Sequence, residues 1–133
     1  MASIFLEFLA DAKAEVREVT PHGAQRRRDG VVLVDVREIE EHELGAIPGS
    51  VHIPRTFLEA QIETEVADLS TPIVVYCAAG VRSIFAARTL LEMGYTDVMS
   101  MSGGFNQWKN ENRPWSGPGA DDADPALVCR SAS

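Results

Sequence analysis

Cysteine is scarce in this chain of 133 residues, which contains only Cys77 and Cys129. Two cysteines so far apart do not make a disulfide framework, and they form no Cys-x-x-Cys pair or other metal-ligand spacing. This usage suits a reducing compartment, so we expect the protein in the cytoplasm and expect neither a metal nor an organic cofactor.

Positive charge is also scarce, with 12 Lys and Arg against 20 Asp and Glu and a net charge of −8. This balance argues against a general binder of nucleic acid or of anionic membranes. The run Arg26-Arg27-Arg28 is a local exception. We interpret it as a solvated helix face before the Asp29-Gly30 turn; the alternative is a docking point for an acidic carrier or an anionic donor.

Long hydrophobic runs are missing as well, so no segment is long enough to span a bilayer. The first eleven residues have no basic region, and Glu7 and Asp11 interrupt their apolar run, which is not the pattern of a secretory signal. The length suits one domain with its own core.

Predicted strands and helices alternate along the chain, which favours an α/β fold with a parallel sheet. We expect strands at 15–19, 31–34, 51–53, 73–76 and 98–101, and helices at 3–14, 21–28, 38–43, within 57–69, from the loop after Tyr76 to Met93, and at 105–111. Residues 1–14 would be a helical extension, 15–115 the domain, and 116–133 a disordered tail rich in Gly, Pro, Ala, Asp and Ser.

The N-terminal helix would carry Ile4, Phe5, Phe8 and Leu9 on one face. We expect this face to pack on the domain and extend its core. A docking or dimerisation helix is the alternative.

The segment Cys77-Ala78-Ala79-Gly80-Val81-Arg82 lies between the apolar run Ile73–Tyr76 and a helical pattern. Free backbone N–H groups and a helix dipole at such a place favour an anion, and therefore a thiolate, which is the nucleophilic form of cysteine. The small residues let the loop curl and point its amides inward, and Arg82 adds a fixed positive charge. A purely structural buried cysteine is the alternative. We favour a cysteine that catalyses a reaction or carries sulfur.

Three further segments accompany this loop in order. They are Val-Val-Leu-Val-Asp-Val-Arg at 31–37, His-Glu-Leu-Gly-Ala-Ile-Pro-Gly-Ser-Val-His-Ile-Pro at 42–54, and Gly-Gly-Phe-Asn-Gln-Trp at 103–108. Together they resemble the rhodanese family in its single-domain form, over roughly residues 15 to 115. The resemblance implies a five-stranded, mostly parallel sheet with helices on both faces, and a cysteine that becomes a persulfide.

The resemblance also implies roles for individual residues. Cys77 would carry the sulfur, residues 78–82 would hold it with their amides, and Arg82 would orient an anionic donor, with a structural ion pair as its other role. Asp35 and Arg37 would support the site through hydrogen bonds, although Asp35 also fits a helix cap. Ser83 would cap the following helix or donate to the site, and capping is our expectation. Trp108 would be core or pocket wall.

Loop length separates two reactions. Thiol phosphatases place one more residue between their cysteine and arginine than the four found here, and a shorter loop suits one sulfur atom better than a phosphate. We assign no catalytic role to His22, His42 or His52. Cys129 would be a free surface thiol, with a relay thiol that takes sulfur from Cys77 as the alternative.

Two hypotheses of function follow. The first is a sulfurtransferase that moves sulfane sulfur from a donor such as thiosulfate to cyanide or a thiol. The second is a persulfide carrier or docking module with little turnover of its own, which presents sulfur to an acceptor protein. We expect a monomer.

Overall fold

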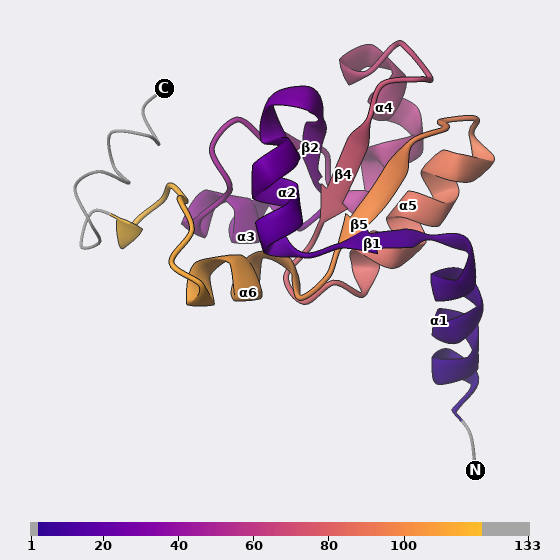
Figure 1. The fold of residues 1–133 in the computed structure, drawn as a ribbon, viewed down its shortest axis with the longest axis horizontal. Coiled ribbons are helices and arrows are strands. Elements are labelled where there is room, and N and C mark those ends of the chain that lie inside the picture. Colours follow the sequence, from indigo (N-terminus) through magenta and orange to yellow (C-terminus); the bar gives the residue numbers. More distant parts are fainter. Residues whose placement is uncertain (1–2, 121–133) are drawn as a thin grey trace.

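Five strands form one sheet in the order β1-β5-β4-β2-β3, and every neighbouring pair is parallel. The computed structural model describes residues 3–120 (Figure 1). The strands are β1 (Arg17–Val19), β2 (Val32–Asp35), β3 (Val51–His52), β4 (Ile73–Tyr76) and β5 (Val98–Met101). This confirms the predicted α/β class.

The central strand β4 shows why the sheet is parallel and covered. Its residues Ile-Val-Val-Tyr are all buried, as in a strand that has helices on both faces. Side chains alternate along a strand, so Ile73 and Val75 join one core while Val74 and Tyr76 join the other.

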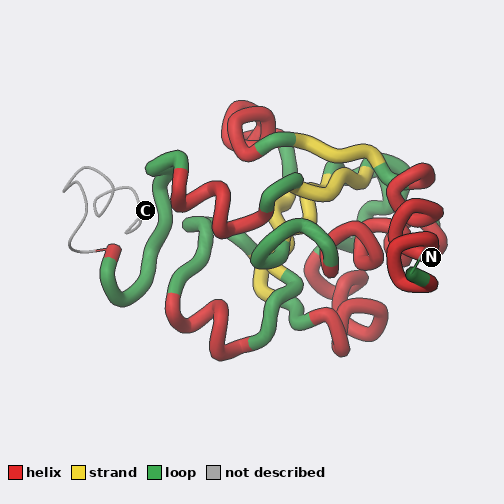
Figure 2. Tube along the Cα trace, turned by 90° about the horizontal axis from the view of Figure 1, so that it is seen from below, coloured by secondary structure: helices red, strands yellow, loops and turns green. Residues whose placement is uncertain are grey.

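Helices cover both faces of the sheet, and the view from below shows them around the strands (Figure 2). Core residues of α1, α4 and α5 gather on one face, and those of α2 and α6 on the other. The helices are α1 (Ile4–Glu15), α2 (Pro21–Arg27), α3 (Ile39–Leu44), α4 (Leu58–Glu65), α5 (Arg82–Glu92) and α6 (Gly104–Asn110), with short 3₁₀ turns η1 (Arg28–Gly30) and η2 (Arg55–Phe57).

Most predicted boundaries lie within two residues of the structure, and two differ by more. Helix α4 ends at Glu65, and Leu69 is exposed, because the chain turns back through Asp68 and Ser70 before β4. Residues 116–120 belong to the folded part: Ser116 and Ala46 exchange two backbone hydrogen bonds of 2.9 Å, and Ala120 is buried. The rest of the predicted tail, including Cys129, lies outside the described residues.

Helix α1 packs on α5 through its inner face. Ala12 is fully buried, and the Phe8 ring stacks on Phe85 with 5.2 Å between centroids. Phe5 also lies against Phe85, yet Phe5 and Phe8 each keep 52% of their surface exposed, and Ile4 is exposed at 86%. The predicted packing of α1 on the domain is therefore partial. Figure 1 shows the helix reaching beyond the sheet. Within residues 3–120, no helix is long and apolar enough to cross a membrane.

Candidate active site

Cys77 follows the last residue of the central strand, at the carboxyl edge where ligands of parallel sheets bind. Its sulfur accepts hydrogen bonds from the backbone N–H of Gly80 at 3.2 Å and of Ser83 at 3.3 Å. The thiol also lies 3.4 Å from the Ser83 hydroxyl. Cys77 has no exposed surface, so the loop closes around it. Donors aimed at one sulfur are the arrangement expected for a thiolate or a persulfide.

Gly80 makes this curl of the loop possible. Its φ of +93° is one that L side chains rarely adopt, and a Cβ there would lie 3.0 Å from the backbone nitrogen of Gly103. The Gly80 amide thus points at the sulfur of Cys77, while the Cα of Gly80 packs against the backbone of residues 101–103 before α6.

Ser83 does not cap α5, contrary to our prediction. The residue at the N-cap is Val81, which provides no side-chain hydrogen bond. The Ser83 hydroxyl instead lies 2.7 Å from that of Ser100 on β5, and both residues are fully buried. Because a buried hydroxyl needs a partner, this pair holds the Ser83 side chain next to the sulfur of Cys77.

Arg82, the last residue of the loop, forms a bidentate ion pair with Glu41 of α3. The two nitrogen–oxygen distances are 2.8 and 3.0 Å. This contact holds the pKa of the Glu41 carboxyl below its ordinary value, chiefly through the hydrogen bond from Arg82. The structural ion pair that was one of the two predicted roles of Arg82 is therefore present. The Arg82 guanidinium thus binds the Glu41 carboxylate, where an anionic sulfur donor was expected.

Asp35 and Arg37 lie together behind the loop, both buried. Arg37 donates Nε to Asp35 Oδ1 and Nη2 to Oδ2, each at 2.9 Å, and its backbone N–H also donates to Oδ1. His42 Nδ1 lies 2.9 Å from Oδ2. Burial alone would raise the pKa of the Asp35 carboxyl, but the hydrogen bonds from Arg37 and His42 outweigh it and lower the pKa. Asp35 is thus not a helix cap but the centre of a buried network.

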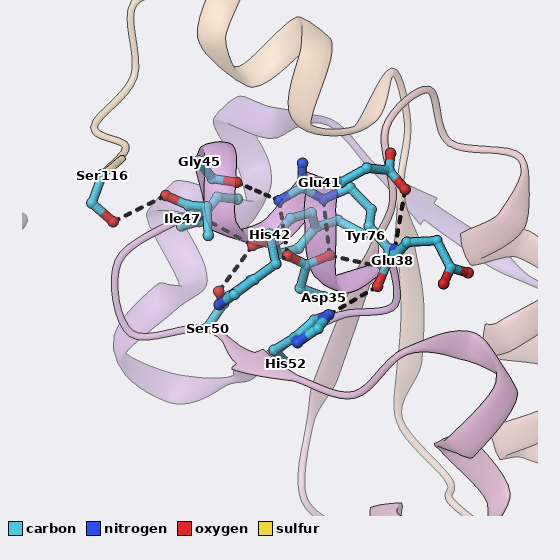
Figure 3. Close-up of polar contacts among 12 residues, drawn as sticks. Asp35, Glu38, Glu41, His42, Gly45, Ile47, Ser50, His52, Tyr76 and Ser116 are labelled. Atoms are coloured by element: carbon cyan, nitrogen blue, oxygen red, sulfur yellow. Dashed lines mark hydrogen bonds and ion pairs between the residues drawn. The ribbon is translucent and has the colours of Figure 1, made fainter. Parts of the chain in front are cut away.

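The network extends from Asp35 to neighbouring loops (Figure 3). Tyr76 accepts from the backbone N–H of Ile47 at 3.1 Å and lies 2.9 Å from the Ser50 hydroxyl. Burial raises the pKa of the Tyr76 hydroxyl, so it stays protonated. The rings of His42 and His52 stack with centroids 4.2 Å apart. These contacts fix the segment between α3 and β3 against the end of β4.

Helix α6 begins directly on the loop. Gly104 has φ +59°, and a Cβ there would lie 2.5 Å from the carbonyl oxygens of Cys77 and Ala78. Those same carbonyls accept from the backbone N–H of Phe105 at 2.8 Å and of Asn106 at 3.0 Å. The absence of a side chain at position 104 therefore allows α6 to anchor the residues around the sulfur.

A small cavity of about 160 Å³ opens beside Ala78, between α3 and α6. Its lining residues are Arg37, Glu41, Leu44, Gly45, Ala78, Phe105, Asn106 and Lys109. The volume corresponds to about five waters at roughly 30 Å³ each, so it suits a small ion and not a nucleotide.

Sequence reasoning located the loop, Asp35 and Arg37, but it missed several partners. Glu41, His42, Ser100 and Lys109 come from other segments that meet at the carboxyl edge. The signal available was topological: β2, β4 and β5 are neighbours, so the loops after them converge. Trp108 is core, fully buried, and its indole N–H donates to the Pro114 carbonyl at 2.7 Å. Among residues 3–120 no three His, Cys, Asp or Glu side chains are grouped to hold a metal ion.

Comparison with known proteins agrees with this geometry. The family model of the rhodanese-like domain matches residues 20–111, which contain the loop, the Asp35 network and all of α6. The chain belongs to the rhodanese family. This confirms the resemblance found in the four sequence segments.

Several rhodanese relatives are similar over most of their length. The thiosulfate sulfurtransferase GlpE of Pseudomonas syringae pv. syringae is 41% identical over 96 residues, which cover 71% of this chain and 89% of that protein. The protein of the same name from Haemophilus influenzae is 36% identical over 100 residues, covering 74% and 92%.

Solved rhodanese-like structures share the fold. The polysulfide-sulfur transferase homodimer of Wolinella succinogenes has a TM-score of 0.76 and 26% identity, covering 86% of this chain and 88% of that one. A protein of unknown function from Rhodopseudomonas palustris, named a possible tyrosine phosphatase, has a TM-score of 0.75 and 29% identity, covering 87% and 96%.

Proposed function

We propose that this protein is a thiosulfate sulfurtransferase that carries the transferred sulfur as a persulfide on Cys77. The observation that carries the proposal is the convergence of the Gly80 and Ser83 amides on the Cys77 sulfur at the end of the central strand. The names of the relatives, with 35–41% identity among the GlpE proteins compared, support the donor.

The first step is a displacement at sulfur. The Cys77 thiolate attacks the outer sulfur of thiosulfate, a new S–S bond forms on the protein, and the bond between the two donor sulfurs breaks. The electron pair of the broken S–S bond leaves with sulfite. Thiosulfate itself is therefore the oxidant, and no other oxidant is required. The product is a persulfide anion on Cys77.

Holding that anion is the task of the loop. The N–H groups of Gly80 and Ser83 already point at the inner sulfur. Those of Ala79 and Val81 form no hydrogen bond with any described residue and would be available to the outer one. In the second step cyanide or a thiol attacks the outer sulfur, takes it as thiocyanate or a new persulfide, and returns the Cys77 thiolate.

The remaining predicted site residues act through others in this proposal. Ser83 holds the sulfur side of the loop, while Asp35 and Arg37 support the wall of the cavity beside Ala78. Arg82 stabilises the end of the loop through Glu41. The short loop, with four residues between Cys77 and Arg82, favours a sulfur atom over a phosphate.

The persulfide carrier remains the second candidate. The burial of Cys77 favours it, because a bulky acceptor reaches a fully covered sulfur only when the loop moves.

We further propose that the protein works as a monomer in the cytoplasm. A dimer in sedimentation equilibrium would contradict the monomer.

The test combines activity with intact mass. Wild type and Cys77→Ser are assayed for thiocyanate formation from thiosulfate and cyanide, and each is weighed after thiosulfate alone. We expect a gain of about 32 Da, one sulfur atom, on wild type only, and turnover that the serine abolishes. A persulfide with negligible turnover would select the carrier. If wild type shows neither the mass gain nor turnover, both candidates are refuted. Cys129→Ser serves as the matched control and should keep full turnover; reduced turnover would support the relay role.

A further inference from the structure

Two cations, Arg37 and Lys109, line the cavity beside the Cys77 loop, and a third, Arg82, contacts the lining residue Glu41. Both arginines are already neutralised. The Arg37 guanidinium is paired with Asp35, and that of Arg82 with Glu41. A bidentate pair of this kind uses the donors that would otherwise bind an anion. The cation expected from the sequence to orient an anionic donor, Arg82, is therefore occupied.

Lys109 is different. It lines the cavity from α6, and it forms no ion pair with any residue between 3 and 120. Its ammonium lies 5.2 Å from the ring centroid of Phe105 and 5.2 Å from that of Trp115. Two aromatic rings hold the charge near the cavity without cancelling it, because a ring attracts a cation but carries no net charge.

The position of Lys109 relative to the sulfur follows from α6. The Phe105 N–H donates to the Cys77 carbonyl, so the first turn of α6 is bound to the loop. Lys109 lies four residues after Phe105 and thus on the same face, one helical turn further along. Ala78, next to Cys77 in the chain, also lines this cavity.

We propose that Lys109 binds the anionic end of the sulfur donor and makes the site selective for negatively charged donors. The ligand class is a small oxyanion such as the sulfonate part of thiosulfate, which agrees with a cavity of about 160 Å³. This deepens the proposed sulfurtransferase function and rests on it for the identity of the donor. Donor binding at Lys109 leaves the Arg82–Glu41 pair intact.

The charge of the site is measured without sulfur transfer by alkylating Cys77. Iodoacetate and iodoacetamide react with a thiolate in the same way, each losing iodide, but only iodoacetate carries a negative charge. The ratio of their rate constants at Cys77, followed by peptide mass spectrometry to separate it from Cys129, cancels the effect of burial. A charge contact at about 4 Å in water is worth about 5-fold in rate.

Four full-length proteins are compared. Lys109→Gln should lower the iodoacetate to iodoacetamide ratio about 5-fold, and Lys109→Arg should restore most of it. Lys13→Gln is the matched control, because it removes the only other lysine of the chain from an exposed position on α1. It should leave the ratio unchanged. In wild type the ratio should fall as salt rises from 0.01 to about 1 M, where the Debye length is about 3 Å.

Thiosulfate kinetics give the second readout. Lys109→Gln should raise KM for thiosulfate by a similar factor while kcat changes little, as for lost binding of the donor's charge. The proposal is overturned if Lys109→Gln leaves both the alkylation ratio and this KM within twofold of wild type. If the ratio falls but thiosulfate never loads Cys77 of the wild type, the sulfurtransferase proposal fails while the anion site stands.

Discussion

Asp35 is the residue on which the area behind the loop depends. Its carboxylate is fully buried and has Arg37 and His42 within 2.9 Å. Removing one member of a buried pair is costly because it leaves the other charge without a partner. The Arg37 guanidinium also donates to the Gly45 carbonyl at 2.6 Å, so the effect reaches the turn after α3.

Asp35→Asn should lower the free energy of unfolding at pH 7 by about 3 kcal/mol or more. The pKa of Asp35 is lower in the folded state than its ordinary value, so the stabilisation is full well above about pH 4 and is lost as pH falls through the folded pKa. The gap between wild type and variant should therefore shrink on acidification below about pH 4. Urea unfolding at several pH values measures it.

The matched control for this effect is Asp97→Asn, which breaks the exposed pair between Asp97 and Arg17. It should cost less than about 1 kcal/mol at pH 7. If both variants lose the same free energy of unfolding, the buried Asp35 pair contributes no more to stability than an exposed pair.

At the scale of elements, α6 and the Cys77 loop form one unit. The unit depends on Gly104, because the backbone of α6 approaches the loop too closely for a side chain there. Two backbone hydrogen bonds from the start of α6 to the carbonyls of Cys77 and Ala78 are the result. The same approach brings Lys109 to the cavity.

Gly104→Ala should lower the free energy of unfolding by about 2 kcal/mol or more, since φ +59° alone costs an alanine about 1–2 kcal/mol and the Cβ meets two carbonyls. It should also slow sulfur loading of Cys77. Gly30→Ala is the control, because a Cβ there meets nothing within 4 Å. Thermal unfolding and intact mass give the two readouts. A Gly104→Ala protein as stable as the control would mean that α6 does not anchor the loop.

On the scale of the whole molecule, two cores share one sheet. The strands supply side chains alternately to both, so neither layer of helices can separate without exposing β4, whose residues are all buried. The structure therefore favours unfolding in one step.

Urea unfolding followed by tryptophan fluorescence and by far-UV circular dichroism should give the same midpoint. The fluorescence of Trp108 and Trp115 reports on the core under α2 and α6, while the dichroism also reports on α1, α4 and α5. Two separated transitions would show that the layers unfold independently.

Local pattern determined the alternation of strands and helices, the placement of Cys77 at the end of a buried strand, and the presence of Asp35 and Arg37 at the end of another. Each of these follows from residues within a few positions of one another, such as the apolar run Ile73–Tyr76 before small loop residues. The family resemblance came from the same segments.

Only the tertiary structure decided which side chains meet. Arg82 pairs with Glu41, and Ser83 pairs with Ser100, which is why the predicted helix cap was wrong. Lys109 shares a cavity with Ala78 because Gly104 admits α6 to the loop. Partner choice of this kind depends on the order of strands in the sheet, which brings the loops after β2, β4 and β5 to one edge. No local periodicity carries that information.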